Sequence, residues 1–387
     1  MTAKPALARG FSLYLDGMRF AAALLVVLDH FSNYPFSSDQ ASPTLFHLLL
    51  SGRGAQAVAV FFVLSGFVIA FVVETRERSL RQYAASRLSR LYSVVLPALL
   101  LTFLLDAGGA LLKPFFYEAT TLDGGPATLP GYAASLLLAG EWKLFGPAAF
   151  IPGSNSPWWS LSFEGTYYLL AGLLLFAPRR WSVPATILIL LLAGPTIAAL
   201  FPLWLLGFAL YHLRHRAPRG VAAGFLLLGS SAALLLIPFV FLIVPDPLPS
   251  GFFPWGPSAQ DRNLVADGLS GVAFAIQLLA VHALVACEAT QPEAITGEAL
   301  IRRLGSMTFP LYAVHFPALF FLAAVSPFPR SSWSSWLFIL SGVLILAALL
   351  TMIADPLRNR MRQWLLHMRP VSWRFPLRRA SAAGHAP

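Results

Sequence analysis

Charged residues and cysteine are both scarce in this chain of 387 residues. Asp, Glu, Lys and Arg make up 11% of it and hydrophobic residues 57%, whereas soluble globular proteins have about 25% charged and about 45–50% apolar residues. So little polar side-chain surface excludes a cytosolic enzyme and a disordered chain. The single cysteine, Cys287, excludes an intramolecular disulfide and a cysteine-based metal cluster.

Long apolar runs are what the sequence has instead. The mean hydropathy is +0.69, and a helix of about 20 apolar residues spans a bilayer. We therefore predict an all-α, polytopic membrane helix bundle. The formal net charge of +10 needs no nucleic-acid partner, because basic cytoplasmic loops supply such a charge in membrane proteins. We expect about ten transmembrane spans, near 18–34, 56–73, 91–105, 160–177, 183–201, 202–213, 220–244, 265–287, 304–325 and 333–354.

The distribution of basic residues predicts that both termini are cytoplasmic. We expect the protein to be a multi-pass protein of the cell (inner) membrane. This orientation places most of the 27 Lys and Arg residues inside. The residues left outside are Arg53, Lys113, Lys143, Arg262 and Arg330. We expect a short cytoplasmic N-terminus over 1–10, a transmembrane domain over 11–360 and a basic cytoplasmic tail over 361–387 that lies on anionic lipid.

Two breaks in the apolar pattern also carry predictions. The stretch 131–150 is interrupted by glycines and charges, which predicts a re-entrant or interfacial segment, because irregular backbone at membrane depth persists where protein buries it. Near the end of the last span, Asp355 stands before Pro356, and we expect this acid to end the helix.

The first span carries Arg19 and, eleven residues later, His30. Eleven helical residues rise about 16 Å and make about three turns, so both side chains share one face. Arg19 then lies near the inner surface and His30 near the membrane centre, along a single channel. Ionisable groups at this depth are functional candidates, although a snorkelling arginine and a hydrogen-bonded histidine give the same spacing. Asp29 either orients a histidine or faces an outer vestibule, and we favour the vestibule.

Two polar pairs follow along the chain. Ser65 and Gly66 form a small pair in the second span, which favours close helix packing over a nucleophilic serine, since that needs an adjacent base. Arg87 and Arg90 lie three apart on one helix face at the cytoplasmic interface. Most such pairs anchor a span, and the functional alternative is a phosphate clamp, for which arginine is well suited.

Later spans carry the remaining candidates. Trp158 and Trp159 suit the outer interface, which places Glu164 about one turn inside the membrane. An unpaired carboxylate there is costly, so Glu164 needs a His or Arg partner or a water-filled cavity. Tyr312 and His315 are three apart and share a face of the ninth predicted span, near the midplane.

Five segments in this order resemble the acyltransferase-3 family of integral-membrane O-acyltransferases that modify exported glycans. They are 14–19 with His30, 61–69, 87–91, 159–164 and 311–315. The resemblance runs from about residue 11 to 360 and implies a ten-helix core with cytoplasmic termini. The chain departs from the family at Gly165, where an aromatic residue is usual, and at Asp355, where Glu is common.

The resemblance implies that acyl-CoA, such as acetyl-CoA, enters from the cytoplasm as co-substrate, with its phosphates on Arg19, Arg87 and Arg90. His30 is then the general base for a hydroxyl of an exported carbohydrate or glycoside, directly or through an acyl carrier. Glu164 would support His30 or act on the acceptor. The supporting residues of this predicted site are Asp29, Ser65, Trp159, Ser160, Tyr312 and His315, the last two for the oxyanion or a proton relay.

Other classes of function use similar residues. A proton-coupled transporter also places His, Glu and Arg inside the membrane, but the sequence shows no duplicated half with matching broken helices. A non-catalytic scaffold in a glycan-export complex fits the number of buried ionisable groups less well. We expect the lipid bilayer as surroundings and no bound metal or cofactor. Many relatives carry an additional esterase-like domain, so the core is expected to act alone or with a separate periplasmic acyl-transfer partner.

Overall fold

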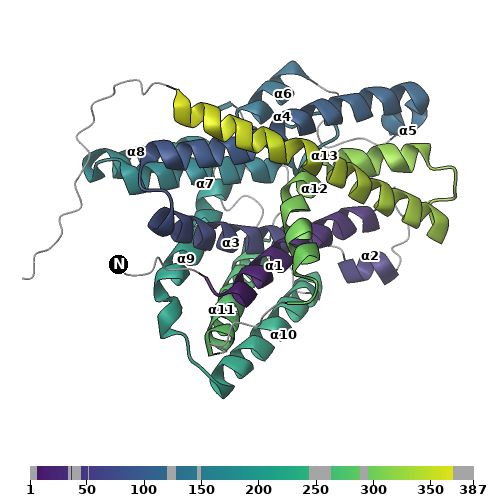
Figure 1. Ribbon diagram of the computed structural model, residues 1–387. Coiled ribbons are helices and arrows are strands. Elements are labelled where there is room, and N and C mark those ends of the chain that lie inside the picture. The colour runs from purple at the N-terminus through teal and green to yellow at the C-terminus, as the bar shows by residue number, and fades with distance from the viewer. Residues whose placement is uncertain are drawn as a thin grey trace, which may run out of the picture.

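The computed structural model describes residues 7–33, 36, 45–50, 52–119, 128–145, 150–243, 263–287 and 295–368, and every regular element in these ranges is helical. The α-helices are α1 (Arg9–Ser32), α2 (Leu45–Leu50), α3 (Arg53–Thr75), α4 (Leu80–Leu112), α5 (Pro114–Ala119), α6 (Leu129–Leu136), α7 (Trp159–Phe176), α8 (Arg179–Ala193), α9 (Pro195–Leu213), α10 (Val221–Ile243), α11 (Leu264–Cys287), α12 (Glu298–Val325) and α13 (Trp333–His367). The predicted all-α bundle is confirmed. Figure 1 places the start of α1 and the end of α13 on the same side of it.

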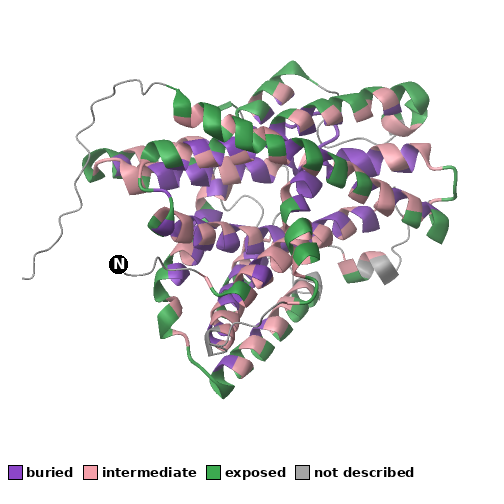
Figure 2. Cartoon of the chain, viewed as in Figure 1, coloured by how far each residue is buried: buried purple, intermediate pink, exposed green. Residues whose placement is uncertain are grey.

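Eight of the described helices are long and apolar enough to cross a membrane, namely α1, α3, α4, α9, α10, α11, α12 and α13. The other two predicted spans correspond to α7 and α8, which have 18 and 15 residues. Burial separates central helices from peripheral ones, as Figure 2 shows. In the 18-residue apolar stretch of each helix, 72% of α12 and 61% of α3 are buried inside the protein, but only 11% of α10 is. Helices α12 and α3 therefore form the centre of the bundle, and α10 faces outward.

The predicted boundary between the spans 183–201 and 202–213 is wrong. The break falls at Gly194, which has a φ of 104° and separates α8 from α9. Pro195 then starts α9, where its missing N–H costs nothing, and Pro202 lies inside that helix. Helices in membranes tolerate an internal proline when neighbouring groups satisfy the backbone.

The expectation that Asp355 ends the last helix is also wrong. α13 continues through Asp355 and Pro356 to His367, so the first part of the predicted tail is helical. Asp355 pairs with Arg358 at 3.4 Å, one turn further along the same face. Arg81 of α4 donates to the backbone carbonyls near the end of α13, which holds this extension against the bundle. The rest of the predicted tail lies outside the described residues.

α3 and α9 approach each other at backbone distance. A Cβ on Gly66 of α3 would overlap the carbonyl oxygen of Trp204, and a Cβ on Gly207 of α9 would overlap the carbonyl oxygen of Val63. Small residues at such a crossing let helices pack closely in a membrane. The packing role favoured for the Ser65–Gly66 pair is confirmed for Gly66.

The predicted irregular segment 131–150 consists of α6, a turn at Leu138 with a φ of 55° and a short 3-10 helix at Lys143–Phe145. Residues 146–149 lie outside the described part of the chain. The segment packs on α7, because the Trp142 indole N–H donates to the Thr166 hydroxyl at 2.9 Å. The backbone N–H of Phe150 donates to the carbonyl of Gly140 at 2.8 Å. Protein therefore covers the irregular stretch at 138–141, whose residues are buried, while Leu137, Leu144 and Phe145 are exposed.

The chain is buried inside the protein where α7 begins. Trp158 is buried, and its indole N–H donates to the Ser135 carbonyl at 3.3 Å. The residues before it, 151–155, are buried as well. The turns that lead into α7 thus lie against other helices, and the first turn of α7 faces the protein interior.

Asn155 fixes these turns to α12. Its side-chain amide donates to the carbonyl of Ala313 at 2.8 Å and to the Thr102 hydroxyl of α4 at 3.2 Å. The Ala313 carbonyl lacks its usual helical donor, because the residue four positions later is Pro317, which has no N–H. The amide therefore satisfies a carbonyl that the proline leaves open.

Candidate active site

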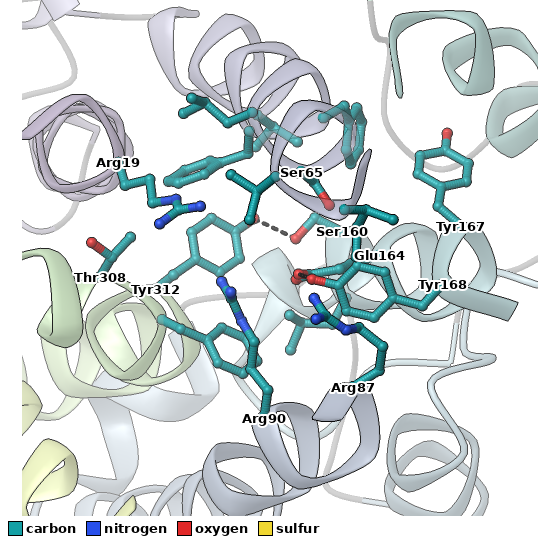
Figure 3. A pocket seen from close by; sticks show the side chains of 18 residues that line it. Arg19, Ser65, Arg87, Arg90, Ser160, Glu164, Tyr167, Tyr168, Thr308 and Tyr312 are labelled. Atoms are coloured by element: carbon teal, nitrogen blue, oxygen red, sulfur yellow. Dashed lines mark hydrogen bonds between the residues drawn. The ribbon is translucent and has the colours of Figure 1, made fainter. Parts of the chain in front are cut away.

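A cavity lies between α1, α3, α4, α7 and α12 (Figure 3). Its wall combines charged side chains and hydroxyl groups with aromatic and aliphatic surface. The charged residues are Arg19, Arg87, Arg90 and Glu164, and the hydroxyl groups belong to Ser65, Ser160, Tyr167, Tyr168, Thr308 and Tyr312. Three cations against one anion suit a ligand that carries negative charge as well as an apolar part.

Arg19 extends from α1 into the cavity (Figure 3). Its counter-ion is Asp16, one turn earlier, at 3.4 Å. The same Asp16 carboxylate lies 3.3 Å from Arg302 of α12, which also pairs with Glu298 at 2.8 Å. Because Asp16 is divided between two arginines, Arg19 is incompletely neutralised and can bind an anion in the cavity.

Arg87 and Arg90 reach the same wall from α4, as their spacing predicts, but their surroundings differ (Figure 3). Arg87 is buried and pairs with Glu77 at 2.8 Å, with the rings of Tyr83 and Tyr168 within 5.6 Å of its guanidinium carbon. The guanidinium group of Arg90 makes no ion pair or hydrogen bond with any residue that the structure describes. Arg87 is therefore held as part of the wall, whereas Arg90 is the cation that remains for a ligand.

Glu164 lies in this cavity with the arginines. The cause is the buried start of α7, which brings its second turn to the centre of the bundle. The hydroxyl of Tyr168, one turn further along α7, donates to the Glu164 carboxylate. The partner is thus a tyrosine, and within the described ranges Glu164 forms no ion pair with a His or Arg.

Hydroxyl groups from three helices line the cavity. The Ser160 hydroxyl donates to the Tyr312 hydroxyl at 2.6 Å, and the Tyr312 hydroxyl donates to the Pro157 carbonyl at 3.3 Å. On α3, the Ser65 hydroxyl accepts from the indole N–H of Trp204 at 3.3 Å. Among the described residues Ser65 has no hydrogen bond to a base, so the structure gives it the environment of a packing residue.

His30 and His315 form a hydrogen-bonded pair across α1 and α12. Nδ1 of His30 lies 2.8 Å from Nε2 of His315, and the two ring planes differ by 11°. Nδ1 of His315 lies 2.7 Å from the backbone carbonyl of Tyr312. His315 is fully buried, while His30 keeps some exposed surface. The supporting role predicted for His315 thus has a geometric basis, since it contacts His30 directly.

Arg19 and His30 lie differently with respect to the cavity. Arg19 lines the cavity, but neither His30 nor His315 is among its lining residues. The rings of Phe61 and Tyr312 line the cavity at this end, 6.1 Å apart, and the Tyr312 ring lies 5.5 Å from that of His315. The histidine pair therefore lies directly behind an aromatic wall. Spacing along one helix could not reveal this wall, because both rings come from other helices.

Two further predicted site residues lie elsewhere. Asp29 neither orients a histidine nor faces a vestibule. Its carboxylate is buried and accepts from the backbone N–H groups of Gly52 at 2.9 Å and Gly54 at 3.2 Å, at the start of α3. A carboxylate there satisfies otherwise unpaired N–H groups. Trp159 packs edge-on against Phe163, with ring centroids 5.2 Å apart, and does not line the cavity.

The family model described as the acyltransferase domain matches residues 12–352, which include the cavity and both histidines. The chain belongs to the acyltransferase-3 family. The resemblance seen in the sequence is thereby confirmed. No solved structure matches the chain.

Two curated relatives of this acyltransferase-3 protein carry names that describe a function. Over 194 residues the chain is 32% identical to acyltransferase MdmB of Streptomyces mycarofaciens, and the matched region covers 49% of this chain and 47% of the relative. Over 154 residues the chain is 30% identical to exopolysaccharide production protein ExoZ of Rhizobium meliloti (strain 1021), and the matched region covers 38% of this chain and 43% of the relative. The matched region is thus less than half of either relative.

Sequence reasoning missed several residues of the site, and two of them, Tyr168 and Glu77, pair with predicted site residues. Tyr168 stands four residues after Glu164, a spacing that places the two on one helix face, so the pattern contained this signal. Glu77 lies between α3 and α4, ten residues before its partner Arg87. No helical spacing connects these two, because the chain turns between them.

Proposed function

We propose that this acyltransferase-3 protein is a membrane O-acyltransferase. It moves a short acyl group, such as acetyl, from cytoplasmic acyl-CoA to a hydroxyl of an exported or cell-surface carbohydrate or glycoside. The observation that carries this proposal is the cationic cavity, which ends at an aromatic wall with a hydrogen-bonded histidine pair behind it. The names of the two relatives support acyl transfer as the reaction and a carbohydrate as the acceptor.

The cavity supports acyl-CoA as donor because of its charges. Phosphate groups bind well to arginine, which donates two parallel hydrogen bonds from a planar group. Arg19 and Arg90 are the guanidinium groups in position to do this, while Arg87 keeps its ion pair with Glu77. Both lie in the first half of their helices, next to the basic segments that the charge distribution assigns to the cytoplasm.

The chemistry requires one base and a path for a proton. The acceptor hydroxyl attacks the thioester carbonyl, a carbon–oxygen bond forms and the carbon–sulfur bond breaks. His30 takes the hydroxyl proton as general base and returns it to the departing CoA thiolate, so the products are an ester and CoA with a free thiol. Because Phe61 and Tyr312 separate the cavity from His30, these rings must rotate for the thioester to reach it.

A reconstituted protein tests the proposal directly. Release of CoA from acetyl-CoA is followed with the purified chain in nanodiscs, with and without exported glycans from the native host. We expect release that depends on the glycans, and we expect Arg90→Gln to raise the KM for acetyl-CoA about 10-fold or more, since a hydrogen bond to a charged group is worth about 1.5–3 kcal/mol. Arg78→Gln is the matched control, because Arg78 is exposed and outside the cavity.

The outcome that contradicts the proposal is equally defined. If glycans never stimulate CoA release, and if proteoliposomes instead accumulate a polar substrate in response to a proton gradient, the protein is a transporter. Mass spectrometry of surface and secreted glycans from a deletion strain gives an independent check. A missing acyl mass that returns with the intact gene, but not with the His30→Ala variant, supports the transferase.

A further inference from the structure

The hydrogen bonds of the histidine pair restrict where protons can lie. The chain of contacts runs from the Tyr312 carbonyl to Nδ1 of His315 at 2.7 Å, and from Nε2 of His315 to Nδ1 of His30 at 2.8 Å. A carbonyl oxygen can accept a hydrogen bond but cannot donate one. Nδ1 of His315 must therefore carry a proton.

The remaining protons follow in sequence. A neutral imidazole has one N–H, so Nε2 of a neutral His315 is an acceptor. Nδ1 of His30 must then be the donor in the contact between the rings. Nε2 of a neutral His30 is left with a lone pair and no hydrogen. Among the described residues no hydrogen bond involves Nε2 of His30, and the residue keeps some exposed surface.

We infer that His315 is a positioning residue that selects the tautomer of His30 and makes Nε2 of His30 the basic atom of the site. The catalytic role of His30 in this inference rests on the proposed acyl transfer. The assignment of protons rests on the two hydrogen bonds of His315, to the Tyr312 carbonyl and to His30. His30 can gain and lose a proton at Nε2 while both hydrogen bonds stay unchanged, because Nδ1 remains the donor in either state. The pair therefore supplies a base whose orientation does not change during proton transfer.

The surroundings hold this arrangement in place. The ring of Phe316 stands edge-on to His30, with centroids 5.2 Å apart. The Asn155 amide, donating to the carbonyl of Ala313, fixes α12 within one turn of His315. The acceptor that directs His315, the Tyr312 carbonyl, belongs to the residue whose side chain lines the cavity. Movement of that ring can open the cavity without removing the backbone group that sets the tautomer.

Nitrogen-15 NMR of the full chain in bilayers, with labelled histidine and no substrate, tests the assignment. We expect the wild-type protein to show a coupling across the bond between the two rings and a His30 with protonated Nδ1 and unprotonated Nε2. In His315→Phe, which keeps a ring but removes both nitrogens, His30 should become a mixture of tautomers. His282→Phe is the matched control, since His282 of α11 packs against Phe11 of α1 and its Nδ1 has no partner among the described residues. A wild-type His30 that carries its proton on Nε2 would overturn the inference, without recourse to any variant.

Kinetics gives a second test that separates positioning from folding. His315→Gln offers an amide oxygen to His30 and an amide N–H to the carbonyl, so it should retain most of the activity. His315→Phe should lower kcat by about 10²–10⁴-fold, the range for a mispositioned general base, with the KM for acetyl-CoA unchanged. Equal activity of the two variants contradicts the inference. If the NMR result holds but no acyl transfer is ever detected, the proposed function fails and the tautomer assignment stands.

Discussion

The buried ion pair between Glu77 and Arg87 leads to a quantitative prediction about stability. The two groups are 2.8 Å apart, and their side chains are 3% and 7% exposed. Removing one partner of a buried pair leaves an uncompensated charge, which costs about 3–5 kcal/mol. Glu77→Leu should therefore lower the free energy of unfolding by about this amount, and by more than a change in side-chain volume explains.

The double variant Glu77→Leu/Arg87→Met should recover most of that loss. Replacement of a whole buried pair by apolar residues is often neutral or stabilising, because it removes the cost of desolvating both charges. The pair is also incompletely satisfied, since Oε2 of Glu77 and Nε of Arg87 have no hydrogen-bond partner among the described residues. A double-mutant cycle then yields the coupling between the two positions.

Equilibrium unfolding in mixed detergent micelles measures all four proteins of this cycle. Glu298→Leu provides the control, because Glu298 belongs to an exposed ion-pair cluster with Arg9 and Arg302, and such pairs contribute little. Two results would contradict this prediction: a Glu77→Leu variant as stable as the control, or a double variant whose loss of unfolding free energy equals the sum of the two single losses. In either case the pair does not act as a buried charge pair, and Arg87 is free to bind a ligand.

Three further predictions concern the path and the packing. His30→Ala should abolish acyl transfer while circular dichroism and membrane insertion stay unchanged, and normal product from this variant would remove His30 from the mechanism. Phe61→Ala should increase CoA release without acceptor, because a smaller side chain opens the aromatic wall to water; unchanged release would show that the wall does not limit access. Gly66→Ala should lower the free energy of unfolding by about 1–3 kcal/mol, since its methyl group overlaps the α9 backbone. Gly224→Ala, with no atom within 4 Å of the added carbon, should be nearly neutral in the same unfolding measurement.

Much of the helical fold could be predicted from apolar runs, because the bilayer imposes length and composition on each span. The boundaries were harder. The break between α8 and α9 falls at Gly194, and the extension of α13 accepts hydrogen bonds from Arg81 of α4, a contact that the local sequence does not encode. Proline was a misleading signal in both cases, since Pro202 and Pro356 lie inside helices.

The candidate site was predictable where residues share one helix. Arg87 and Arg90 reach a common wall because three residues make nearly one turn. The contact between His30 and His315 joins positions 285 residues apart, and no local pattern encodes a contact at that separation. The position of Glu164 beside the arginines of α1 and α4 was not predictable for a related reason, since it depends on turns before α7 that fold into the interior.

The carbonyl that Pro317 leaves without a helical donor connects two distant positions of the sequence. Asn155 is needed as a donor because residue 317 is a proline, and the proline is tolerated because an amide stands at 155. We expect these positions to change together over evolutionary time. A homologue with alanine at 317 would be free to vary at 155, whereas loss of the amide beside an unchanged proline would be selected against.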